Sequence, residues 1–175
     1  MAEVHIIGRI VGATDFEESS LFCKWGMHTG GAWKLIEGQK EGQTHVDEPI
    51  TDQMTSWSHP VDLHYGTKGV QGWPRLHVQV WHQDSHGRVE LFGYGFIHVP
   101  TSPGHHELEC MTWKPVGTLS EQVQSYFVGG SLYLKNPDVV YSGFDRYKLK
   151  TRASGKVHIH LDLIFRNFDK YGIEC

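Results

Sequence analysis

Cysteine is scarce in this chain, with three among 175 residues. Cys23, Cys110 and Cys175 are widely spaced, and no Cys-x-x-Cys pair occurs. A disulfide framework needs an even set of closely spaced cysteines, and a thiolate zinc site needs paired ones. Neither is therefore indicated, and reduced thiols in the cytoplasm are the simplest interpretation.

Long hydrophobic runs and lipidation motifs are also lacking. No window approaches the roughly 20 apolar residues of a spanning helix, and the N-terminus has no basic start or cleavage site of a secretory signal. Ala2 excludes the usual glycine-dependent myristoylation, and Cys175 lacks the residues of a prenylation box. We expect any membrane association to come through partners or a surface patch.

Positive charge is not in excess, since the formal net charge is −4. Nonspecific nucleic-acid affinity comes from neutralising phosphates with Lys and Arg, so we expect no nucleic-acid partner, although a local basic face stays open. The length of 175 residues and the hydrophobic content of 39% suit one domain, spanning 1–175, with a proper core.

Catalytic signatures are missing as well. Neither Gly-x-Ser-x-Gly nor a phosphate loop occurs, and the segment 154–156 is better interpreted as a turn. Thirteen histidines suggest a metal. His158 and His160 would point the same way on a strand, but two ligands are not a site, and the adjacent His105 and His106 would diverge. We therefore expect no enzyme, no cofactor and no metal.

Alternating hydrophobicity is what the chain does have. Leu76, Val78 and Val80 alternate with polar or aromatic neighbours, which is the period of a half-buried strand. A polar stretch over 82–88 reverses the chain before a second strand. The full set of predicted strands covers 3–10, 21–27, 32–36, 44–46, 57–64, 76–81, 91–99, 146–151 and 156–165.

Two further local patterns complete the expected fold. Gly30 and Gly31 indicate a hairpin turn between the second and third strands. Thr118-Leu-Ser-Glu121 resembles a capping box that begins one short helix before Gly129. Many short strands with one helix predict an all-β fold, an antiparallel β-sandwich of about eight strands.

Segment 81–93 carries a tryptophan, two acids and a glycine in the order of the Trp-Asp-x-Asp…Asp-x-x-Gly segment of calcium-dependent C2 domains, which it resembles. Calcium takes several oxygen ligands from two loops at one end of such a sandwich. Only Asp84 and Glu90 remain here, because His82 stands at the first acid and Ser20 stands where the partner loop would place its own. The resemblance implies a C2-like sandwich that has lost its calcium cluster and kept its shape.

Further motifs extend over the whole chain: Leu21-Phe-Cys-Lys-Trp-Gly26, Trp57-Ser-His-Pro-Val-Asp62, Gly69-Val-Gln-Gly-Trp-Pro-Arg-Leu76, Gly93-Tyr-Gly-Phe96 and Arg166-Asn-Phe-Asp-Lys-Tyr-Gly172. In this order and spacing they resemble the B9 domain-containing proteins of the ciliary transition zone. The resemblance implies a non-enzymatic scaffold subunit in the cytoplasm and cytoskeleton at the cilium base, at the basal body and transition zone. The implied partners are other B9 domain-containing proteins and components of the tectonic-like complex, which forms a diffusion barrier.

A basic face is predicted near the C-terminus. Segments 146–152 and 156–163 both alternate, and 153–155 between them predicts a three-residue hairpin loop with Gly155 in the left-handed position. That register places the apolar residues on one face. The outer face would carry four cations beside the two histidines: Lys148, Lys150, Arg152 and Lys156. It is either a solvated face or a site for an acidic partner or anionic lipid.

Two single residues also stand out. Trp73, in a Gly-Trp-Pro segment, is either a structural ring or an exposed anchor at an interface. Gly93 lies on an expected strand, where a missing side chain predicts close approach of a neighbour. Three functional classes remain, in this order: an interaction module for sister subunits, a calcium-independent membrane-surface module that binds anionic lipids, and a metal-dependent enzyme.

Overall fold

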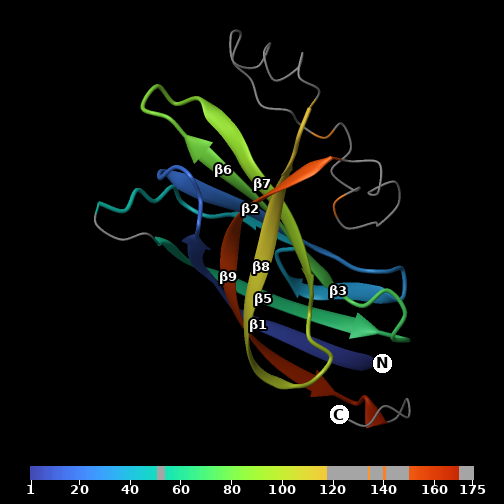
Figure 1. Cartoon of the computed structure of the whole chain (residues 1–175). Coiled ribbons are helices and arrows are strands. Elements are labelled where there is room, and N and C mark those ends of the chain that lie inside the picture. The colour runs from blue at the N-terminus through green and yellow to red at the C-terminus, as the bar shows by residue number, and fades with distance from the viewer. Residues whose placement is uncertain (51–53, 118–133, 135–139, 141–149, 170–175) are drawn as a thin grey trace.

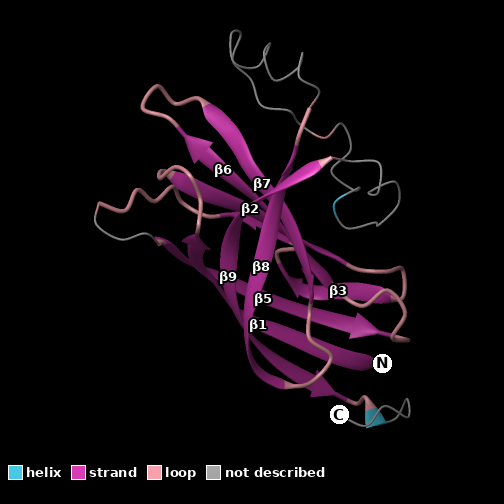
Figure 2. Cartoon of the chain, viewed as in Figure 1, coloured by secondary structure: helices cyan, strands magenta, loops and turns pink. Residues whose placement is uncertain are grey.

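The structure is a computed structural model that describes residues 1–50, 54–117, 134, 140 and 150–169. Strands make up most of this part of the chain (Figure 2). Nine are described: β1 (Ala2–Thr14), β2 (Leu21–His28), β3 (Trp33–Gly38), β4 (Glu41–Gln43), β5 (Thr55–Thr67), β6 (Arg75–Gln83), β7 (Val89–His98), β8 (Gly104–Pro115) and β9 (Thr151–Arg166). The predicted helix after Thr118 lies outside the described residues.

The nine strands form one antiparallel sheet in the order β3-β5-β1-β9-β8-β7-β6-β2-β4. The sheet bends so strongly that its two halves lie over one another, with β9 and β8 at the bend (Figure 1). The two halves act as the two layers of a sandwich. This arrangement confirms the predicted all-β, C2-like antiparallel fold.

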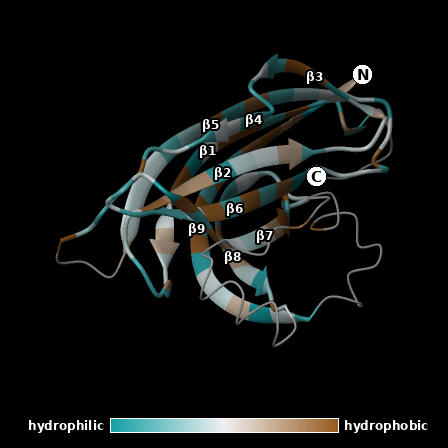
Figure 3. Ribbon diagram, turned by 90° about the horizontal axis from the view of Figure 1, so that it is seen from above, coloured by the Kyte–Doolittle hydropathy of each residue, from teal (hydrophilic) through white to brown (hydrophobic). Residues whose placement is uncertain are grey.

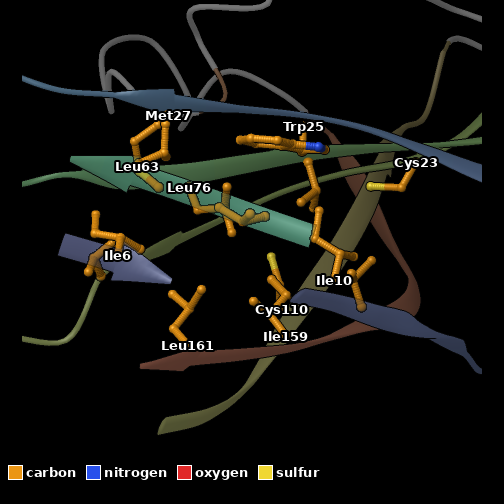
Figure 4. Close-up of a cluster of buried hydrophobic side chains, with 14 of the residues drawn as sticks. Ile6, Ile10, Cys23, Trp25, Met27, Leu63, Leu76, Cys110, Ile159 and Leu161 are labelled. Carbon is orange, nitrogen blue, oxygen red and sulfur yellow. The ribbon is translucent and has the colours of Figure 1, made fainter. Parts of the chain in front are cut away.

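Alternation along each strand explains why one face is buried. In β9 the buried residues Val157, Ile159 and Leu161 alternate with more exposed polar residues, and hydrophobic and hydrophilic bands alternate along the ribbons (Figure 3). The core lies between the two layers: Trp25 and Met27 of β2 come from one side, and β1, β5 and β9 face them from the other (Figure 4). Burial of this apolar face fixes the register of the strands.

One tryptophan joins the layers by a polar contact as well. The indole nitrogen Nε1 of Trp57, on β5, donates a hydrogen bond of 3.0 Å to the backbone oxygen of Leu21, on β2. The ring itself is buried in the core. A tryptophan is stable inside a core when its N–H finds such a partner.

Gly93 lies where three strands converge. A Cβ atom at this position would stand 2.7 Å from Oγ1 and 2.9 Å from Cβ of Thr112 on β8. The Thr112 hydroxyl donates to the backbone oxygen of Gly155 at 2.7 Å, and the Ser154 hydroxyl donates to that of Phe92 at 2.7 Å. The predicted close approach at Gly93 is confirmed, and it joins β7, β8 and β9.

The predicted hairpin over 146–163 is wrong. Residues 153–155 lie inside β9, where Ala153 pairs with Trp113 of β8 and, after a β-bulge or irregularity in the register, Lys156 pairs with Met111. Gly155 is not in the left-handed conformation, since it is not among the glycines with positive φ. Its lack of a side chain instead leaves room for the ring of Phe16. The predicted turn at 154–156 therefore does not form. Gly155 is required by the close packing of Phe16 and not by the conformation of a turn.

Three other local predictions need correction. Gly30 and Gly31 do not close a hairpin, because β2 pairs with β4 and β6 whereas β3 pairs with β5. Gly30 instead donates its backbone N–H to the Gly72 oxygen at 2.8 Å. The fourth strand, β4, covers Glu41–Gln43 and ends just before the predicted range 44–46. The whole of β8 was missed; its first half alternates the exposed His105, Glu107 and Glu109 with the half-buried His106 and Leu108, and only its second half buries Cys110, Thr112 and Trp113.

Candidate functional site

The end of the sandwich where a C2 domain holds calcium is closed here by hydrogen bonds. His82, at the end of β6, donates from Nδ1 to the backbone oxygen of Ser19 at 2.6 Å; a carbonyl only accepts, so this nitrogen carries the proton. The neighbouring Gln83 donates its backbone N–H to the Ser20 oxygen at 3.0 Å. The loop before β2 and the loop after β6 are thus joined directly, at the two positions where the sequence departs from the calcium pattern.

The carboxylate of Asp84 is hydrogen-bonded to residues of its own loop. Its carboxylate accepts hydrogen bonds from the backbone N–H of His86 at 2.9 Å and of Arg88 at 2.8 Å, and from Nε of Arg88 at 2.6 Å. Desolvation alone would raise the pKa of Asp84, but these hydrogen bonds outweigh it and lower the pKa below its usual value. A metal at this carboxylate would have to replace them, so the acid acts as a structural element of the 84–88 turn.

The predicted basic face is interrupted by acids. Arg152 lies 3.1 Å and Lys114 lies 3.6 Å from the Glu17 carboxylate, and Lys156 lies 3.3 Å from that of Glu109. Lys150 is exposed, and its backbone oxygen accepts the N–H of Val116. Lys148 lies outside the described residues. Exposed pairs of this kind contribute little to stability, and they reduce the local positive potential; whether these cations bind a partner or lipid stays a prediction.

Trp73 packs against other aromatic rings, as in the structural alternative of the two that the sequence left open. Its Nε1 donates to the Val99 oxygen at 2.8 Å. The ring meets Trp33 edge-on at 5.1 Å between centroids, Phe165 at 5.8 Å and Phe168 at 6.4 Å. It remains partly exposed, so contact with a partner at its outer edge stays a prediction.

The two described cysteines are buried thiols. Burial, reinforced by the neighbouring Cys110, raises the pKa of Cys23, and burial raises that of Cys110 to about 12. Both are therefore protonated at neutral pH and serve as small core residues.

Sequence reasoning missed a surface on the outer face of β8 and β9. The cross-strand pairs are His105 with Asp162, Glu107 with His160 and Glu109 with His158. On β8 the sequence signal was the alternation of His105, Glu107 and Glu109 with the residues between them, but only one of those residues, Leu108, is apolar, which is too weak a pattern to mark a strand. The expected divergence of His105 from His106 is confirmed: the former is exposed, and the latter is half-buried and hydrogen-bonds the Ser102 oxygen at 2.9 Å.

Two strands of the described sheet lie at its edges. β3 pairs with β5 alone, and β4 pairs with β2 alone. The side chain of Ile36 on β3 is 45% exposed. Such edges offer backbone groups and apolar side chains to another chain. Within the described part of the chain, no helix combines the length and hydrophobicity of a membrane-spanning segment.

Comparison with known proteins decides the family. The model of a family described as "Ciliary basal body-associated, B9 protein" (B9-C2) matches residues 4–164. This chain belongs to the B9-C2 family. It is 62% identical to B9 domain-containing protein 2 of Homo sapiens over 175 residues, covering 100% of both chains, and 61% identical to that of Danio rerio over 174 residues, covering 99% of both.

A more distant relative carries a different name. B9 domain-containing protein 1 of Mus musculus is 28% identical over 172 residues, which cover 97% of this chain and 84% of the relative. Among solved structures, the C2A domain of plant Extended Synaptotagmin 1 aligns over 94% of both chains at 15% identity, with a TM-score of 0.42. The B9-C2 match thus agrees with the resemblance seen in the sequence, and it associates the family with the ciliary basal body.

Proposed function

We propose that this chain is a non-enzymatic scaffold subunit of the tectonic-like complex at the ciliary transition zone, where it binds other B9 domains. In this role it supports ciliogenesis and the ciliary diffusion barrier. The observation that carries the proposal is the match to the B9-C2 model over residues 4–164, nearly the whole sandwich. We therefore expect a function that belongs to this family to be performed by the matched region, of which the described part is the sandwich with its faces, edges and loops.

The geometry of the sandwich supports this interpretation. The loop end that serves calcium in related folds is held by the bond from His82 to Ser19, and Asp84 is used by Arg88. Among the described strands, β3 and β4 form the two edges of the sheet, where a second sheet could pair. Pairing along an edge and packing beside it are the usual ways in which sheet proteins hold a partner.

The alternative is a calcium-independent membrane-surface module. It would use Lys150, Arg152 and Lys156 to bind anionic headgroups. Its support is weaker, because Glu17 and Glu109 lie against two of these three cations. Each juxtamembrane cation contributes about 1 kcal/mol at an anionic surface, and a neighbouring carboxylate opposes much of that attraction.

The experiment is purification of the tagged chain from ciliated cells, with quantification of the proteins that co-purify. We expect other B9 domain-containing proteins in stoichiometric amounts. The variant Ile36→Glu places a charge on the β3 edge and should reduce that recovery. Val89→Glu is the matched control, because Val89 is 47% exposed and lies at the start of β7, inside the sheet order.

Both variants should keep the melting temperature of the parent, since each side chain is substantially exposed. Recovery of the unmodified chain without any B9 partner, from cells in which those partners are folded, would count decisively against the proposal. Equal recovery by Ile36→Glu and Val89→Glu would exclude the β3 edge and leave the scaffold role to another surface.

A further inference from the structure

The acid–histidine surface of β8 and β9 holds a group of potential metal ligands. In two of its three cross-strand pairs, His105 lies opposite Asp162 and Glu107 lies opposite His160. The ligand atoms of His105, Glu107 and His160 all lie within 4.8 Å of one another. Two imidazoles and a carboxylate are a donor set that suits zinc.

One of these histidines is already oriented for coordination. Nδ1 of His105 lies 2.8 Å from Oδ1 of Asp162, and the carboxylate oxygen accepts, so Nδ1 carries the proton. The opposite nitrogen, Nε2, is thereby left with its lone pair when the ring is neutral, and it lies 3.7 Å from Oε1 of Glu107. A carboxylate that accepts from one nitrogen while the metal takes the other is the common arrangement around zinc-binding histidines.

We propose that His105, Glu107 and His160 bind a zinc ion on the outer face of β8 and β9. Asp162 is a positioning residue that acts through His105. Three protein ligands leave the fourth tetrahedral position to water or to a group from a partner. This inference does not depend on the scaffold role.

The distances are compatible with a small closure around the ion. Zinc–ligand bonds of about 2.0–2.1 Å in a tetrahedron place the ligand atoms about 3.3 Å apart. Ligand atoms that lie as much as 4.8 Å apart must therefore approach one another by about 1.5 Å. Nε2 of His105 and Oε1 of Glu107, which lie 3.7 Å apart, need a smaller movement. His105 and Glu107 are exposed at 54% and 73%, so rotation of their side chains suffices and the backbone ladder stays in place.

The rings also converge. The centroids of His105 and His160 lie 5.8 Å apart with the planes at 78°. A second group of possible ligands, Glu3, His5 and His64, differs in this respect, because its two imidazoles are stacked 3.9 Å apart at 16°. Stacked rings direct their nitrogens side by side rather than at one point, so the β8–β9 group is the better site.

Neighbouring charges act in both directions. Glu107 and Asp162 attract a cation, whereas Arg9, in register with His160 on β1, opposes it. Lys156 lies two cross-strand pairs away from Glu107 and is paired with Glu109. Glu109 therefore reduces the repulsion that Lys156 would exert on a bound ion, and substitution of Arg9 tests the remaining repulsion.

The experiment is calorimetric titration of the full chain with zinc at neutral pH, in a Cys175→Ser background that removes the terminal thiol as a competitor. We expect one saturable site. His105→Gln and His160→Gln should abolish it, and Asp162→Asn should weaken it about 10- to 100-fold. Arg9→Gln should tighten it. At a free zinc concentration about a hundredfold above the dissociation constant, the melting temperature should rise by roughly 5–10 °C.

His158→Gln and His5→Gln are the matched controls, one on the next cross-strand pair and one in the stacked group. Both should bind zinc like the parent. The absence of saturable zinc binding by the parent would overturn the proposal. So would loss of binding in either control with retention in His105→Gln, because the ion would then lie elsewhere.

Discussion

Replacement of Gly93 by alanine should destabilise the chain through one identifiable contact. The new Cβ would lie 2.7 Å from Oγ1 and 2.9 Å from Cβ of Thr112, below the distance that real Cβ atoms keep. Thr112 has little freedom to move, because it is buried and donates to the Gly155 oxygen at 2.7 Å. Overpacking of this kind costs about 1–3 kcal/mol.

The measurement is urea and thermal unfolding of Gly93→Ala beside Gly31→Ala. A Cβ on Gly31 meets nothing within 4 Å, and its φ is not positive, so that control should be neutral or stabilised by about 0.4–1 kcal/mol. For a chain of this length each kcal/mol shifts the melting temperature by about 2–4 °C. Gly93→Ala should therefore melt roughly 2–12 °C below the parent.

A double variant separates the contact from a general effect on β7. Thr112→Ala alone removes the hydroxyl and leaves the buried Gly155 oxygen without its donor, which costs about 1–3 kcal/mol. In the Gly93→Ala background, Thr112→Ala also removes the shortest contact of the new Cβ. The loss of stability in the double variant should therefore be smaller than the sum of the losses in the two single variants. Full additivity, or a Gly93→Ala variant as stable as Gly31→Ala, would refute the reasoning.

Three further predictions concern the loops and the cations. Asp84→Asn should lower the melting temperature at pH 7, and the difference from the parent should begin to shrink below about pH 4 and be lost as the pH falls through the lowered pKa of the folded state. A carboxylate whose pKa is lowered by folding stabilises fully above its ordinary pKa and loses that effect as it is protonated, so a difference that stays constant as the pH falls through the acid range would contradict the hydrogen-bonded carboxylate. Millimolar calcium should leave the melting curve unchanged, because His82 and Asp84 are already bonded, and a rise of several degrees would contradict this. Replacement of Lys148, Lys150 and Arg152 by Glu should preserve folding and weaken binding to an acidic partner or anionic vesicles in a salt-sensitive way, and unchanged binding of both would leave only a solvated face.

The fold could be predicted where hydrophobic alternation is strong. β6 shows this, because Leu76, Val78 and Val80 are all buried as expected. β8 could not be predicted in this way, since its less exposed positions include His106 and Thr112 and its exposed ones include the apolar Met111. Its burial comes from packing at the bend rather than from its own composition.

The largest error of the sequence-based prediction was the hairpin turn at Gly155. A glycine between two alternating segments, such as Gly155, is compatible with a hairpin turn and with one long strand. Which of these two structures forms depends on the side chains that pack against the glycine. The decision rests on Phe16, which is 139 positions away in the sequence and occupies the space beside Gly155. Long-range packing of this kind has no local signature.

The site was predicted in part. The departures at His82 and Ser20 marked the two loops that the structure joins, but the hydrogen bonds between these loops were not predicted from the sequence. The acids that face Arg152 and Lys156 could not be foreseen, because Glu17 and Glu109 come from segments whose neighbours depend on the bend of the sheet. The same bend placed the missed strand β8 beside β9.

The central claim is that the sandwich assembles with another B9 domain, and reconstitution tests it most directly. The chain and B9 domain-containing protein 1 should be co-expressed without calcium, and the mass of the eluted species measured by light scattering on a sizing column. The account predicts one species whose mass is the sum of both chains in a fixed ratio. Two folded proteins that elute separately as monomers would contradict it.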